Sequence, residues 1–165
     1  MEAREYRTQD KTGWGPGPWQ DEPDKMQFVD QATGLPCLIV RSPMSGSLCG
    51  YVGVPETHKA FELHYDTELV QGINVHGGLT FSDHCTKGGA EEIHICHVPA
   101  AGEPDNVWWF GFDCAHSGDK TPAMEARFRA YLPAHLMALY KDDKYRTINY
   151  VKRNIARLAL QLNDL

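Results

Sequence analysis

The sequence predicts one α+β domain: a mainly antiparallel sheet with C-terminal helices packed on one side. Short apolar runs separated by turn residues fill the chain up to residue 113, and helical periodicity begins only after that point. The 165 residues include no linker long enough to separate two domains. We therefore expect an N-terminal arm over residues 1–25 and a single domain over residues 26–165.

The expected arm is rich in glycine and proline, which disfavour a regular helix. Trp14 and Trp19 lie within it, whereas disordered segments are poor in aromatic residues. We therefore expect an extended segment whose tryptophans pack onto the domain or onto a partner subunit.

Two apolar runs near the start of the domain predict a hairpin. They span residues 36–42 (PCLIVRS) and 48–54 (LCGYVGV), and the turn sequence PMSGS lies between them. Further strands are expected over residues 70–76 and 79–82, on either side of a tight turn at Gly77-Gly78.

The later strands differ in pattern. Residues 92–98 (EIHICHV) alternate in the way typical of a strand with two different faces. Residues 107–113 (VWWFGFD) are almost wholly apolar, which predicts a central strand covered on both faces.

Two helical regions follow. Residues 123–140 have helical spacing, but Pro133 should split them because proline disrupts a helix interior. Thr147 is placed to cap a last helix that runs to about Leu162, in which apolar residues recur at intervals of three and four.

Composition excludes several classes of protein. The formal net charge of −6 argues against a general nucleic-acid binder, which needs a basic face. No apolar run approaches the length of a membrane span, and the N-terminus does not resemble a secretory signal. The five cysteines are odd in number and include no CxxC pair, so we expect free thiols and a cytoplasmic location.

The first candidate site segment is VHGGLTFS, residues 75–82. His76 is followed by Gly77 and Gly78, whose backbone amides can cradle an oxyanion, and then by the hydroxyls of Thr80 and Ser82. These groups suit phosphate or acyl chemistry. The alternative is a simple hairpin turn with a locally bonded histidine.

The second candidate segment is FDCAHSGD, residues 112–119, at the end of the most apolar strand. Asp113 or Asp119 beside His116 is a plausible acid/base dyad, because a carboxylate orients an imidazole. Asp119 can equally be a turn or helix cap. Cys114 suits a nucleophile, but we favour a small buried side chain.

Other residues bear on ligands and metals. Trp109 is a candidate for stacking on a base, with burial in the core as the default. His94, Cys96 and His97 lie close in sequence, but no standard zinc spacing is present. We therefore favour no cofactor and keep zinc as an alternative.

Long runs of the chain carry a resemblance. EPDKMQFVDQATGLPCLIVRSP, LCGYVGVPETH, VHGGLTFS, WWFGFDCAHSGD and YRTINYVKRNIARLA resemble a family of small uncharacterised proteins of phages and prophages. The resemblance covers nearly all of the chain after the arm. It implies a host cytosol as location and makes antagonism of nucleotide immune signals a hypothesis.

The leading hypothesis is a small phosphodiesterase-like hydrolase of nucleotides, with His76 and His116 as its acid/base pair. Two-histidine phosphodiesterases use paired H-x-[ST] motifs, and both histidines here depart from that pattern. One alternative is a nucleotide-binding protein without turnover that can form a homo-oligomer, and the other is a structural or host-interaction protein that uses the arm.

Overall fold

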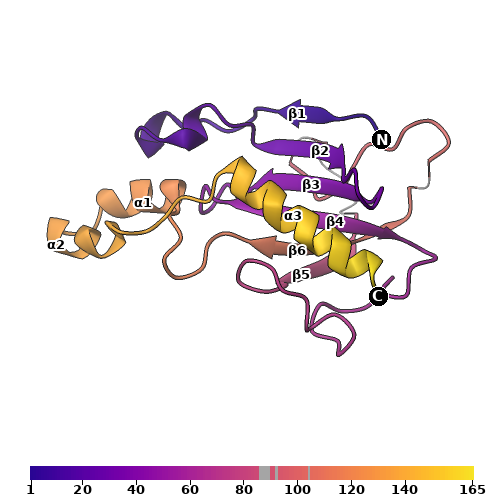
Figure 1. The fold of residues 1–165 in the computed structure, drawn as a ribbon. Coiled ribbons are helices and arrows are strands. Elements are labelled where there is room, and N and C mark those ends of the chain that lie inside the picture. Colours follow the sequence, from indigo (N-terminus) through magenta and orange to yellow (C-terminus); the bar gives the residue numbers. More distant parts are fainter. Residues whose placement is uncertain (86–89, 92, 104) are drawn as a thin grey trace.

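The computed structural model describes residues 1–85, 90–91, 93–103 and 105–165. It contains a six-stranded sheet in the order β1-β2-β3-β4-β6-β5, in which every neighbouring pair is antiparallel (Figure 1). The helices follow the last strand, so the predicted α+β class is confirmed. Within the described ranges, no helix has the length and apolar character needed to cross a bilayer.

The strands are β1 Arg4–Tyr6, β2 Lys25–Val29, β3 Pro36–Arg41, β4 Leu48–Pro55, β5 Phe81–His84 and β6 Val107–Asp113. The α-helices are α1 Pro122–Arg129, α2 Ala134–Met137 and α3 Ile148–Asn163. Three short 3₁₀ helices complete the elements: η1 Thr12–Trp14, η2 Pro18–Gln20 and η3 Ala138–Tyr140.

The predicted hairpin is confirmed, because β3 and β4 pair directly. The predicted central strand is confirmed as well, since β6 lies between β4 and β5 and is buried along most of its length. Side chains on these strands alternate between two hydrophobic clusters, as the two-residue repeat of a strand requires.

The larger cluster lies between the sheet and α3, and includes Val52, Phe110 and Ile155. Figure 1 shows α3 lying across one face of the sheet, over β3 and β4. The smaller cluster contains Leu38, Tyr51 and Trp109 from alternate strand positions, and Ile95 packs against it.

The helical predictions are confirmed. Pro133 separates α1 from α2, and Thr147 is the N-cap of α3, with its hydroxyl accepting a hydrogen bond from the Tyr150 amide. The apolar stripe of α3 supplies Val151, Ile155 and Leu158 to the larger cluster.

Two expected strands do not form, and the reason is visible in the backbone hydrogen bonds. Residues 70–76 run as turns, because side chains of α3 satisfy their amides: Gln161 accepts from the Asn74 amide, and Asn154 accepts from the His76 amide. In the strand expected over residues 92–98, residue 92 lies outside the described residues; residues 93–98 lack strand structure, and the Gln27 side chain bonds the Val98 amide. Apolar residues of the first segment fill the core without joining a ladder, whereas in the second Ile95 packs against the smaller cluster and Ile93 is exposed.

The N-terminal segment is part of the fold, which corrects the expected boundary at residue 25. Its strand β1 is the edge of the sheet, and β2 already begins at Lys25. Trp19 packs against Tyr145 with 5.1 Å between ring centroids, which confirms the expectation that it contacts the domain.

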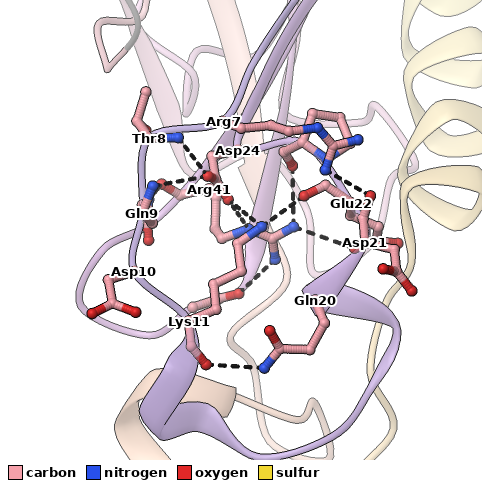
Figure 2. Close-up of polar contacts among 12 residues, drawn as sticks. Arg7, Thr8, Gln9, Asp10, Lys11, Gln20, Asp21, Glu22, Asp24 and Arg41 are labelled. Atoms are coloured by element: carbon pink, nitrogen blue, oxygen red, sulfur yellow. Dashed lines mark hydrogen bonds and ion pairs between the residues drawn. The ribbon is translucent and has the colours of Figure 1, made fainter.

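A buried ionic cluster anchors this segment (Figure 2). The Asp24 carboxylate accepts hydrogen bonds from the amides of Thr8 and Gln9 and lies 2.7 Å from Lys11 Nζ and 2.8 Å from Arg41 Nε. Burial alone would raise the pKa of Asp24, but the contacts with Lys11, the two amides and Arg41 hold it below its ordinary value.

The cysteine prediction is wrong for one pair. Cys85 and Cys96 form a disulfide, whereas Cys37, Cys49 and Cys114 are free. The sequence spacing gave no sign of the pair, because tertiary packing over Trp109 brings the two segments together.

Candidate functional site

The two candidate segments meet at one edge of the fold. The loop before β5 brings His76, and the loop after β6 brings His116 and Asp119. The imidazole rings of His76 and His116 have centroids 5.6 Å apart. The pairing that the sequence hypothesis required is therefore present.

Asp119 is the centre of this group. It is 4% exposed, and its carboxylate accepts hydrogen bonds from His76 Nε2 at 2.6 Å, from Arg146 Nε at 2.7 Å and from the His116 amide at 3.1 Å. Burial alone would raise its pKa, but the bonds from Arg146 and His76 outweigh burial and lower it. Asp119 is therefore an ionised acceptor.

Backbone pairing fixes the position of Asp119. Lys120 donates its amide to the Lys144 carbonyl, and Lys144 donates its amide to the Gly118 carbonyl. Because Lys144 leads directly into Arg146 and the cap of α3, this pairing brings the start of α3 beside the loop after β6.

α3 restrains His76 through two side chains. The Tyr150 hydroxyl lies 2.8 Å from His76 Nδ1, and the Asn154 side chain accepts the His76 amide at 3.1 Å. With Asp119 on Nε2, both ring nitrogens of His76 are engaged. Nε2 donates to the carboxylate, so a neutral His76 accepts the Tyr150 proton at Nδ1.

His116 is held less tightly. Its side chain is 35% exposed, and its Nε2 lies 3.5 Å from Asp113 Oδ1, which is ion-pair range without a hydrogen bond. Its Nδ1 has no hydrogen-bond partner among the described residues. Nε2 is buried, but the half-exposed ring is more open to a ligand than that of His76, which is 13% exposed.

The glycine turn is adapted to His116. Gly77 has a φ of 69°, and a Cβ at this position would lie 2.0 Å from His116 Nε2. Gly78 also has a positive φ, but its amide donates to the Val75 carbonyl. The expected two-amide cradle is thus reduced to the Gly77 amide, which has no partner among the described residues.

Two guanidinium groups flank Tyr150. The Arg146 guanidinium carbon lies 4.8 Å from the ring centroid and that of Arg153 lies 5.8 Å from it. Arg146 uses only Nε for Asp119 within the part of the chain that is described, so its terminal nitrogens remain available to an anion.

Other predicted ligand-binding residues do not join the group. Ser82 accepts the Tyr65 amide, and Thr80 lies exposed at the start of β5 with its amide bonded to Gly111. Trp109 is fully buried and donates to Cys85 Sγ, so it cannot stack on a base in this conformation. Cys114 is a buried thiol, and burial raises its pKa, as expected of a small core residue.

The sequence interpretation missed three residues of the group. Tyr150 and Asn154 lie four residues apart on one face of α3, and Arg146 directly precedes the Thr147 N-cap of that helix. A polar stripe beside the apolar stripe of the same helix was the available signal.

The metal candidates are arranged differently from the expectation. Cys96 and His97 form a group with Cys85, and His94 is not part of it. This group is separate from the histidine pair.

Comparison with known proteins gives no relative: no family model, curated protein or solved structure matches the chain.

Proposed function

We propose that this chain is a small hydrolase of the phosphodiesterase type, acting on a nucleotide or a nucleotide-like phosphate ester. The observation that carries the proposal is the approach of two imidazoles, His76 and His116, beside Asp119, whose carboxylate accepts hydrogen bonds from the His76 ring and from the His116 backbone amide. One group that accepts a proton and one that delivers a proton are what the cleavage of a phosphate ester requires.

His116 takes the role of the group that contacts substrate. Its side chain is 35% exposed, and Nδ1 of a neutral imidazole can accept a proton from the attacking water. Asp113, 3.5 Å from Nε2, stabilises the imidazolium that results.

His76 acts through Tyr150, because its own nitrogens are both engaged. In its protonated form His76 donates from Nδ1 to the Tyr150 oxygen, and the Tyr150 hydroxyl gives its proton to the leaving oxygen. Before this transfer, Asp119 stabilises the His76 imidazolium. After it, the proton on His76 Nδ1 moves to the Tyr150 oxygen and restores the hydroxyl. Tyr150 is thus the acid and His76 a positioning residue.

Positive charge for the phosphate comes from Arg146 and Arg153, on either side of the Tyr150 ring. Arginine suits this role because its planar fork matches phosphate oxygens. The Gly77 amide adds a backbone donor beside His116.

The second candidate function is nucleotide binding without turnover. The observation that favours it is that both ring nitrogens of His76 are engaged by Tyr150 and Asp119. A histidine held in this way can serve as a rigid structural element without transferring a proton. For both candidate functions, the hypothesis that a phage protein antagonises host nucleotide signals rests on the sequence resemblance alone.

The test is incubation of the purified chain with a panel of cyclic and linear nucleotides, followed by denaturation and mass spectrometry of the released molecules. New product masses are expected, and His116→Ala should lower the rate by about 10²–10⁴-fold. His64→Ala is the matched control, because His64 is an exposed histidine outside the site whose imidazole pairs with the exposed Asp66.

Tyr150→Phe separates the two roles of α3, because it removes the hydroxyl and keeps the ring between the arginines. It should abolish turnover while the affinity for the nucleotide stays. Enrichment of intact nucleotide by every variant supports binding alone. If the wild-type chain shows no turnover and enriches no nucleotide, both candidate functions are refuted.

A further inference from the structure

A second group of reactive side chains lies apart from the histidine pair, around the disulfide between Cys85 and Cys96. One ligand atom each from Cys85, Cys96 and His97 lies within 4.8 Å of the other two. Two sulfurs and an imidazole nitrogen form a ligand set typical of zinc.

His97 supplies an independent sign of a missing partner. It is 6% exposed, and its Nδ1 is buried with no hydrogen-bond partner among the described residues. A buried polar atom without a partner is costly, and such atoms in native proteins commonly face an ion or a water.

The surroundings hold the three ligands in place. Trp109, fully buried, donates its indole N–H to Cys85 Sγ at 3.4 Å and packs edge-on against His97. Gln27 bonds both the amide and the carbonyl of Val98, which fixes the backbone directly after His97. Such fixed supports are what keep metal ligands oriented.

We propose that the reduced chain binds one zinc-class divalent cation through Cys85, Cys96 and His97, and that the disulfide is the metal-free, oxidised state of the same site. Tetrahedral zinc holds sulfur and nitrogen ligands about 3.5–3.8 Å apart, so the group needs side-chain movements on the order of 1 Å. Water or an added ligand fills the fourth position.

The chemistry balances with a dithiol as reductant. The dithiol gives two electrons and two protons to the disulfide and becomes a cyclic disulfide, leaving two thiols on the chain. Zn²⁺ then displaces one proton from each thiol, and the metal–dithiolate unit carries no net charge. In the reverse direction a disulfide oxidant takes two electrons from the two thiolates and two protons from solvent and becomes two thiols, while the Cys85–Cys96 bond re-forms and the cation is released, so the redox state controls occupancy.

Native mass spectrometry of the full chain tests this, after reduction in the presence of a slight excess of zinc. The expected result is the mass of one zinc ion less two protons for the reduced chain, and no bound zinc for the oxidised chain. Cobalt in place of zinc should give the visible bands of a tetrahedral site and a thiolate charge-transfer band in the near ultraviolet.

Matched variants assign the ligands. Cys96→Ser and His97→Ala should each weaken zinc binding at least 10-fold, whereas Cys37→Ser and His64→Ala should leave it unchanged, since neither residue belongs to the group. If a ligand variant does not fold, the comparison of oxidised with reduced wild type and the cobalt spectrum still decide the matter. Absence of micromolar binding by the reduced wild type, or full binding by the ligand variants, overturns the proposal and leaves a purely structural disulfide.

Discussion

Replacing Gly77 by alanine tests whether the glycine turn exists to seat His116. The added Cβ would lie 2.0 Å from His116 Nε2, so the imidazole has to withdraw by about 1.4 Å to reach ordinary contact at 3.4 Å. The backbone adds strain, because Gly77 has a φ of 69°, and a left-handed alanine costs about 1–2 kcal/mol.

Gly78→Ala provides the matched control. Gly78 also has a positive φ, of 83°, but a Cβ there meets nothing within 4 Å. Both variants should therefore lose about 1–2 kcal/mol of unfolding free energy, from the backbone alone. Gly77→Ala should lose somewhat more and should also displace His116.

Two measurements separate these effects. Chemical denaturation gives the change in unfolding free energy, and NMR of the imidazole nitrogens reports the environment of His116. We expect the His116 signals to shift in Gly77→Ala and to stay at their wild-type positions in Gly78→Ala. Identical His116 signals in the two variants would show that the contact between Gly77 and His116 has no consequence.

Three further predictions concern the supports of the fold and of the site. Asp24→Ala removes the carboxylate that Lys11 and Arg41 share in the interior, so denaturation should show a loss of about 3–5 kcal/mol, against less than about 0.5 kcal/mol for the exposed Asp66→Ala. Because the folded pKa of Asp24 is depressed, its contribution is present above the ordinary value of 3.8 and is lost as the pH falls through the folded pKa. The stability gap between wild type and Asp24→Asn should therefore close below about pH 3.8, and a gap that stays constant with pH would contradict the ionic account. Asn154→Ala removes the acceptor of the His76 amide, which should lower the unfolding free energy by about 1–3 kcal/mol. Hydrogen exchange at the His76 amide should accelerate. Unchanged protection of that amide would mean that α3 does not hold the loop.

The sequence determined most of the regular structure. The apolar runs at residues 36–42 and 48–54 and the turn residues between them are local properties of the chain, and the corresponding strands β3 and β4 pair as predicted. The same holds for the Pro133 break and the Thr147 cap, because both act on backbone groups within one turn of helix.

Prediction was less successful where apolar residues fill the core without pairing. Residues 70–76 have the composition of a strand, but the α3 side chains Asn154 and Gln161 take the hydrogen bonds that a ladder would provide. The donors of these bonds lie more than seventy residues from the acceptors, as the His76–Asn154 separation of 78 residues shows, so no local pattern contains them.

The candidate site divides in the same way. The sequence alone identified His76, Gly77, His116, Asp113 and Asp119, because these polar residues interrupt apolar runs at turns. Tertiary structure alone decided that the imidazoles meet with 5.6 Å between ring centroids, that Asp119 bonds both the His76 ring and the His116 amide, and that Trp109 is buried. It also added Tyr150 and Arg146 and joined Cys85 to Cys96. The physical reason is that residue chemistry and periodicity are encoded along the chain, whereas distances between side chains exist only after the sheet and α3 have packed together.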